Sequence, residues 1–238
     1  MAQKRVHQVH IDDIGDVFLT KRRGSRSLRI SISADGKVRI GLPYWASYNS
    51  AISYAKERRN WIVAHMSGNP PSVLKNNQRI GKAHTLYFVS ASNSTPKSQV
   101  TKTAILLKSN LVPTDEQVQV KARSACEQAL KNEALVLLSY RLKELADRYG
   151  FEYSSLRIRK LTSRWGSCSS KRSITLSYFL MQLPWELIDY VILHELVHTK
   201  YLNHSPQFWQ TLETLAPQAK KKQKIVRAHK PRIEPWSL

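Results

Sequence analysis

Apolar and polar residues alternate through several short segments in the first half of the chain. A period of two puts every second side chain on one face, which is typical of a half-buried strand. The segments with this pattern are residues 28–33, 38–42, 85–89 and 104–108. Asp35-Gly36 favours a hairpin turn between the first two, a helical period covers residues 47–66, and the polar residues 90–98 favour a loop. Residues 1–112 are therefore expected to form a β-rich region.

The pattern becomes helical after this region. Leucines three and four residues apart form the apolar stripe of a long helix, made of Leu135, Leu138, Leu142, Leu145 and Tyr149. The expected elements are a helix from Pro113 to Gly150, strands at residues 156–159 and 174–177, and an apolar helix from Pro184. This order predicts an α+β region over residues 113–238, in which the last helix lies beside a small sheet.

Residues 194–204 read His-Glu-Leu-Val-His-Thr-Lys-Tyr-Leu-Asn-His. His194 and His198 are four residues apart, so on a helix they share a face and can hold one metal ion. Glu195 follows the first of them, where its carboxylate can reach a water on the metal without binding the metal itself. His204 would supply a third nitrogen. Three protein ligands with one open position are typical of a catalytic zinc site.

The third histidine requires a break in the helix. At 100° per residue, His204 would point about 240° away from His198 on a continuous helix. The helix is expected to end at Leu202-Asn203, since asparagine tolerates a left-handed C-terminal cap. Ser205-Pro206 then favours a new helix, with serine as the N-cap and proline in the first turn.

Several other residues near this motif have more than one possible role. Glu213 is an alternative third ligand, and Asp189 could orient a ligand histidine. Tyr201 and Arg164 are candidates for stabilising a developing negative charge, although each also has an ordinary structural role. Cys168 favours a small-residue turn packed on the metal-binding helix. Three histidines without a partner at ligand spacing are expected at the surface: His65, His84 and His229.

Charge and composition indicate which partners and which cellular location to expect. The net charge of +21 favours polyanions such as nucleic acid, and the densest basic run, residues 220–224, is expected to lie in a basic C-terminal tail. Weak, sequence-independent nucleic-acid binding is therefore predicted. No stretch approaches the roughly 20 apolar residues of a membrane span, and residues 1–7 do not read as a signal peptide. The two cysteines are far apart in the sequence. A cytoplasmic protein is expected.

Several motifs together resemble the YgjP-like metallopeptidase family, which is related to the SprT-like and yeast Wss-type DNA-repair proteases. The segments that carry the resemblance are Arg164–Ser170, Pro184–Val191, His194–Leu196, Asn203–Ser205 and Phe208–Trp209. Weaker similarity extends to the N-terminal hairpin and the helix containing Trp61. The resemblance implies a zincin-like fold, one zinc ion per chain bound by the three histidines, and Glu195 as general base.

These observations predict a zinc-dependent hydrolase, with a metallopeptidase as the leading hypothesis. The substrate is expected to lie as an extended strand against a sheet edge at residues 174–177. Hydrolysis of a nucleotide phosphoanhydride, with lysine and arginine binding the phosphates, ranks second because no glycine-rich phosphate loop accompanies it. A DNA-associated protease, or a nucleic-acid-binding module with a structural zinc, is a third alternative. Glu195 argues against a structural zinc, because such a site has no use for that carboxylate.

Overall fold

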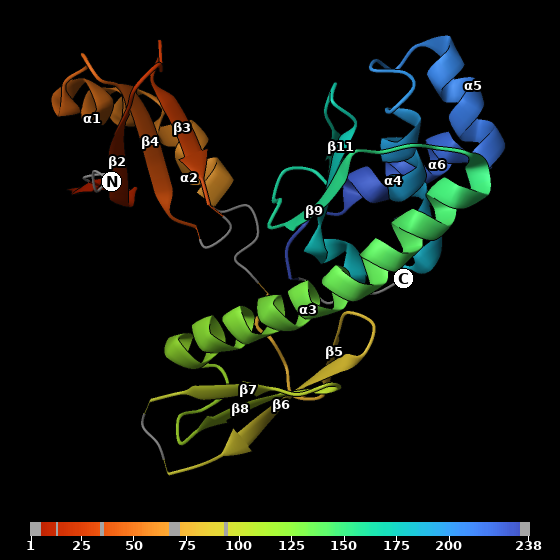
Figure 1. Ribbon diagram of the computed structural model, residues 1–238. Coiled ribbons are helices and arrows are strands. Elements are labelled where there is room, and N and C mark those ends of the chain that lie inside the picture. The colour runs from red at the N-terminus through yellow and green to blue at the C-terminus, as the bar shows by residue number, and fades with distance from the viewer. Residues whose placement is uncertain (1–5, 13, 34–35, 67–71, 93–94, 234–238) are drawn as a thin grey trace. The chain divides into compact units, whose positions relative to one another are not determined.

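The computed structural model describes residues 6–12, 14–33, 36–66, 72–92 and 95–233, with only the backbone described for residues 64–66. The chain divides into two compact units, Met1–Ser72 and Val73–Leu238, both of which contain helices and strands (Figure 1). The predicted α+β class is confirmed. Within the described residues, no helix combines the length and apolar composition needed to cross a bilayer.

The first unit is a four-stranded sheet with two helices. Its elements are β1 (Val6–Ile11), β2 (Gly15–Arg22), β3 (Arg29–Ile32), β4 (Val38–Pro43), α1 (Tyr48–Glu57) and α2 (Arg59–Met66), and the strand order is β1-β2-β4-β3. The predicted hairpin is confirmed by the antiparallel pairing of β3 with β4, while Asp35 of its turn lies outside the described residues. The predicted helix over residues 47–66 is two helices that meet at Arg58, and Ser47 caps the first.

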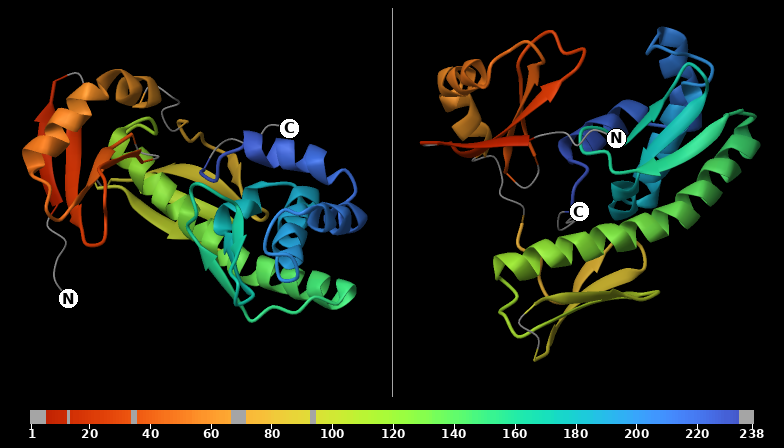
Figure 2. Two further views of the ribbon diagram at one scale, coloured as in Figure 1. Left: turned by 90° about the horizontal axis from the view of Figure 1, so that it is seen from above. Right: turned by 60° about the vertical axis from the view of Figure 1, so that its left-hand side comes forward.

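The second unit begins with another four-stranded sheet, which one long helix covers. The strands are β5 (Gln78–Ile80), β6 (His84–Ser90), β7 (Lys97–Val100) and β8 (Ala104–Ser109), in the order β5-β6-β8-β7. The helix is α3 (Glu116–Tyr149), with Asp115 as its N-cap and Gly150 in the left-handed conformation at its end, as expected. Figure 2 shows α3 with this sheet on one side and the C-terminal strands and helices on the other.

A buried carboxylate fastens this sheet to α3. Glu133 accepts hydrogen bonds from the backbone N–H groups of Lys82, Ala83 and His84 at 2.7, 2.9 and 3.2 Å, and from the His84 ring at 2.6 Å. The other ring nitrogen of His84 faces the Thr101 carbonyl at 2.9 Å. His84 is 4% exposed, so the expectation of a surface histidine is wrong. Its partner, Glu133, is 49 residues away in the sequence, and local spacing could not reveal it.

The boundary between the two compact units lies between Ser72 and Val73, whereas the sequence pattern predicted it at residue 112. That residue lies between β8 and α3, inside the second unit. A boundary there would separate the sheet of β5–β8 from the helix that packs on it and from the carboxylate of Glu133. The sheet and the C-terminal helices also contribute to one continuous core cluster.

A three-stranded sheet and three helices complete the second unit. The elements are β9 (Ser155–Arg159), β10 (Gly166–Cys168), β11 (Ser173–Ser177), a 3-10 turn η1 (Tyr178–Gln182), α4 (Trp185–Val197), α5 (Pro206–Leu215) and α6 (Ala219–Ala228). The strand order is β10-β11-β9. The expectation that residues 174–177 form a sheet edge is therefore wrong, because β11 is central and the short β10, which contacts α4, is the edge.

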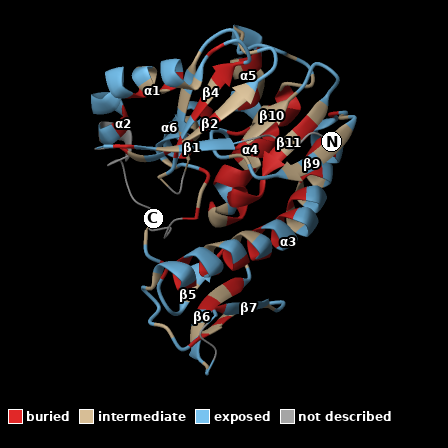
Figure 3. Cartoon of the chain, turned by 90° about the vertical axis from the view of Figure 1, so that its left-hand side faces the viewer, coloured by how far each residue is buried: buried red, intermediate tan, exposed pale blue. Residues whose placement is uncertain are grey.

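Helix α4 is buried on nearly all sides, whereas α3 and α6 show exposed faces (Figure 3). Helix α6 carries the basic run of residues 220–224, which was expected in a tail. Val226 of α6 is 6% exposed, and its carbonyl accepts the Trp165 ring N–H at 3.0 Å. The basic segment is therefore part of the folded unit.

Replacing Glu133 by leucine should lower the free energy of unfolding by at least about 3 kcal/mol, because several buried donors lose their acceptor at about 1–3 kcal/mol each. Urea denaturation measures this change. Lys131→Ala, on the exposed face of α3, is the matched control and should change stability by less than about 0.5 kcal/mol. A loss below about 1 kcal/mol for Glu133→Leu would contradict the anchoring role.

Candidate metal centre

Helix α4 ends immediately before the second histidine of the motif. Its last residue is Val197, and His198 is the C-cap. The N–H and the hydroxyl of Thr199 both donate to the Leu196 carbonyl, at 2.9 and 2.7 Å, which tightens the chain into a turn. The predicted end at Leu202-Asn203 is wrong, and Asn203 does not adopt a left-handed conformation. The Thr199 hydroxyl therefore satisfies a carbonyl at the end of the helix without a left-handed cap.

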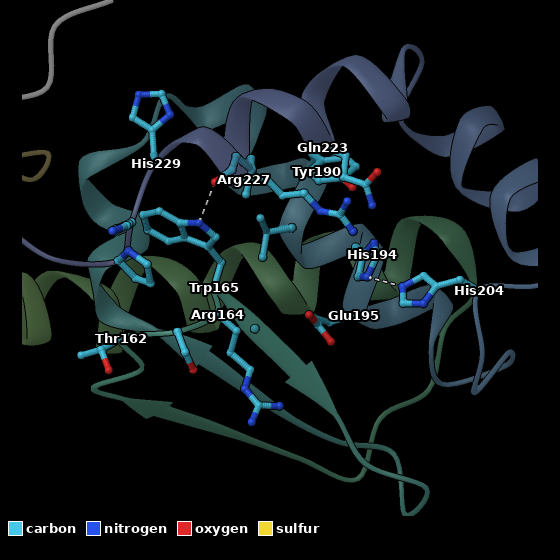
Figure 4. A pocket seen from close by; sticks show the side chains of 16 residues that line it. Thr162, Arg164, Trp165, Tyr190, His194, Glu195, His204, Gln223, Arg227 and His229 are labelled. Carbon is cyan, nitrogen blue, oxygen red and sulfur yellow. Dashed lines mark hydrogen bonds between the residues drawn. The ribbon is translucent and has the colours of Figure 1, made fainter. Parts of the chain in front are cut away.

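The turn brings the three histidines together. Their ligand nitrogens all lie within 4.8 Å of one another, and Nε2 of His204 is 3.1 Å from Nε2 of His194 (Figure 4). The new helix start is confirmed, since the Ser205 hydroxyl accepts the Phe208 N–H at 3.3 Å and Pro206 occupies the first turn of α5.

The chemistry of these nitrogens fits a divalent metal ion. The Tyr201 carbonyl can only accept, so the His198 Nδ1 that lies 2.9 Å from it carries hydrogen and leaves Nε2 with a lone pair. Nε2 of His194 and of His204 face each other, so both cannot carry hydrogen. Burial, with the neighbouring charges of His198 and His204, lowers the pKa of His194 to about 3. Neutral imidazoles are the form that binds metal.

Glu195 lies beside the cluster and is 5% exposed. Burial raises the pKa of its carboxyl to about 8, an effect that Arg164 opposes; a nearby dication would favour the charged form. The carboxylate approaches β10 closely, because a Cβ at Gly166 would lie 2.6 Å from its Oε1. A larger residue at position 166 would displace the carboxylate.

A pocket of about 480 Å³ opens next to the histidines and Glu195 (Figure 4). Its other lining residues come from the loop before β10, from α4, from α6 and from the segment after α6: Thr162, Ser163, Arg164, Trp165, Gly166, Tyr190, Val191, Gln223, Val226, Arg227, His229, Lys230 and Pro231. Of the two candidate stabilisers, Arg164 lines the pocket and Tyr201 does not. The Tyr201 side chain packs against the core cluster instead.

Sequence reasoning missed three residues that line this pocket. Tyr190 precedes His194 by four residues and so shares its face of α4, a signal that was available; burial raises its pKa to about 12. Gln223 and Arg227 come from α6, and nothing in the sequence links that helix to the histidines.

The remaining candidates have other contacts. Glu213 accepts the N–H groups of Gln218 and Ala219 at 2.7 and 3.0 Å, and so caps the start of α6. Asp189 accepts two hydrogen bonds from Arg141, at 2.7 and 2.5 Å, and contacts α3 instead of a histidine. Burial raises the pKa of the Cys168 thiol on β10 to about 11, which favours the protonated form.

Comparison with known proteins gives one family and several similar solved structures, among them the two described below. The YgjP-like family, described as the YgjP-like metallopeptidase domain, matches residues 26–229. The crystal structure of the metallopeptidase zymogen of Pyrococcus abyssi abylysin is 28% identical, with a TM-score of 0.36 over 39% of this chain and 93% of that one. That of Methanocaldococcus jannaschii jannalysin is 22% identical, with a TM-score of 0.34 over 38% and 95%. No curated protein matches.

Removing the third imidazole should weaken zinc binding. We expect His204→Ala to raise the zinc dissociation constant by more than about 100-fold, since loss of even a residue that only supports a ligand costs 10- to 100-fold. Competition with a chelating dye measures the affinity, and elemental analysis measures the occupancy. Glu213→Gln is the control and should retain full affinity. Full affinity in His204→Ala with loss in Glu213→Gln would reverse the ligand assignment.

Proposed function

Because this chain belongs to the family of YgjP-like metallopeptidase domains, we propose that it is a zinc-dependent peptidase. One zinc ion per chain would be held by His194, His198 and His204, with Glu195 as the general base. The observation that carries this proposal is the convergence of three ligand nitrogens within 4.8 Å beside a buried carboxylate. A site with three protein ligands leaves a position open for chemistry.

Bound zinc would supply a Lewis acid at the scissile carbonyl and lower the pKa of a water molecule to about 7. Glu195 accepts a proton from the attacking water and delivers it to the leaving amine nitrogen as the C–N bond breaks. The Tyr201 carbonyl holds the His198 ring in one orientation through the 2.9 Å hydrogen bond. Arg164, in the same pocket, is the better placed candidate for stabilising the developing oxyanion.

The substrate would lie along β10, not β11. Ser177 N–H donates to the Trp165 carbonyl, and Ser169 N–H donates to the Ser173 carbonyl. Because hydrogen-bonded pairs alternate in an antiparallel ladder, the backbone groups of Gly166 and Cys168 point to the free edge. An extended peptide can add there as a further strand, next to the carboxylate of Glu195.

Hydrolysis of a nucleotide phosphoanhydride is the second candidate. The positively charged side chains of Arg164, Arg227 and Lys230 in the pocket lining favour it, while family membership favours the peptidase. The two reactions can be separated by incubating the zinc-loaded protein with casein and, in parallel, with nucleoside triphosphates.

In both assays, Glu195→Gln should lower turnover by about 100- to 10,000-fold, the contribution typical of a general base, without loss of zinc. Glu186→Gln changes an exposed carboxylate on the same helix and should keep wild-type turnover. The substrate whose hydrolysis depends on Glu195 is the substrate of this site. Wild-type turnover of both substrates by Glu195→Gln would mean that the measured hydrolysis occurs elsewhere.

Nucleic acid remains a predicted weak partner on the basis of charge. Helix α6 forms part of the pocket wall, so deleting it would also disturb the pocket. Replacing exposed lysines of α6 therefore tests nucleic-acid binding more cleanly. We expect binding to single- or double-stranded DNA to fall progressively from about 50 to 200 mM salt. Replacing the exposed residues Lys220, Lys221 and Lys224 by glutamine should reduce the slope of log K against log salt by up to about 0.9 per lost contact. Binding that is absent at low salt, or independent of salt, would remove nucleic acid as a partner.

A further inference from the structure

The pocket beside the histidines carries an excess of positive charge. Its lining contains Arg164, Arg227 and Lys230, and Glu195 is its one carboxylate. Glu195 is buried against β10, and one carboxylate does not balance three cations. The arginine and lysine side chains come from the loop before β10, from α6 and from the segment after α6, three separate parts of the second unit.

Among the described residues, no ion pair joins Arg164, Arg227 or Lys230 to a carboxylate, although the charge of Arg164 acts on Glu195. Cations elsewhere in the second unit do have such partners. Arg141 is bonded to both Asp189 and Glu144, and Lys222, on the same helix as Arg227, is 3.1 Å from Glu186. Arg141 and Lys222 therefore differ from the three cations of the pocket lining, for which no such pair occurs within the described residues.

The three cations are exposed residues that line one concave site. The Arg227 side chain extends from α6 towards His194 (Figure 4). Cations that share one concave site repel one another, and low-dielectric walls strengthen the field between them. An anion in the pocket would remove that repulsion and provide acceptors for the guanidinium groups.

The backbone that carries Arg227 is held in place by contacts of α6. Its neighbour Val226 is buried and accepts a hydrogen bond from the Trp165 ring, and Glu213 caps the first turn of the same helix. A fixed backbone limits the positions that the guanidinium group can reach, and so lowers the entropy lost when it binds an anion. Arg227 is exposed like most lysines of α6, but unlike those lysines it lines the pocket.

We infer that the pocket receives an acidic side chain of the substrate, a carboxylate or a phosphate ester, next to the bond that is cleaved. Arg227 would be its principal contact, and Arg164 and Lys230 would add to the field. The pocket volume of about 480 Å³ is sufficient for one such side chain. This inference rests on the proposed peptidase function, for which it names the substrate class.

The test uses one peptide backbone with a single cleavable bond. The residue on each side of that bond is varied in turn among Asp, Glu, phosphoserine, Asn, Gln, Ser and Lys, and cleavage is followed by mass spectrometry. We expect kcat/KM for the acidic peptides to exceed that for their neutral counterparts by about 10- to 100-fold, as for a hydrogen bond to a charged group. Comparing the Asp and Glu peptides with the phosphoserine peptide shows whether a carboxylate or a phosphate is preferred.

Arg227→Gln should remove most of this preference while changing cleavage of the neutral peptides by less than threefold (about 0.6 kcal/mol). Lys224→Gln is the matched control, because Lys224 is exposed on α6 and does not line the pocket; it should keep the preference. Arg227→Glu should reverse it in favour of a lysine at the same position. Circular dichroism and zinc content verify that each variant folds.

A second measurement is independent of turnover. In the Glu195→Gln background, calorimetry should show tighter binding of the acidic peptide than of the neutral one, and Arg227→Gln should abolish that difference. Cleavage that depends on Glu195 but is equal for acidic and neutral peptides would overturn the inference and leave the peptidase intact. If no peptide is cleaved, the peptidase proposal fails, and equal binding of the two peptides then overturns the inference as well.

Discussion

The whole site depends on where one helix ends. His194 and His198 share a face of α4, but on a continuous helix His204 would point about 240° away from His198. The chain leaves the helix after Val197, and the Thr199 hydroxyl and N–H satisfy the Leu196 carbonyl that the helix no longer serves. The same turn presents the Tyr201 carbonyl to the His198 ring. One local break therefore creates the triad and orients one of its members.

Two carboxylates, Glu133 and Glu213, stabilise the second unit around that turn, and a third, Glu195, does not. Glu133 ties the sheet of β5–β8 to α3 through backbone N–H groups. Glu213 caps α6 and so fixes the helix that carries Arg227. Glu195 shows no comparable hydrogen bond to the backbone within the described residues. Its position against Gly166 keeps an ionisable group at the pocket, which is costly for folding and useful for proton transfer.

The features that the sequence predicted are those that local spacing decides. The four-residue interval between His194 and His198, the Ser205-Pro206 helix start and the Gly150 cap all depend on neighbours within one or two turns. One error is local, since α4 ends at Val197 and not at Leu202-Asn203, and the others concern contacts between distant segments. The partner of His84 is 49 residues away, and the order that makes β10 an edge strand follows from pairing β11 with β9. Arg227 reaches the pocket only because α6 packs beside α4.

The central claim is that three imidazoles and no carboxylate or thiolate bind one zinc ion. X-ray absorption of the zinc-loaded protein, combined with anomalous diffraction from its crystals, tests this directly. We predict one zinc ion with nitrogen ligands at about 2.0–2.1 Å from His194, His198 and His204, and a fourth position that no protein atom fills. A sulfur ligand from Cys168, a carboxylate from Glu213 or a fourth protein ligand would contradict the account.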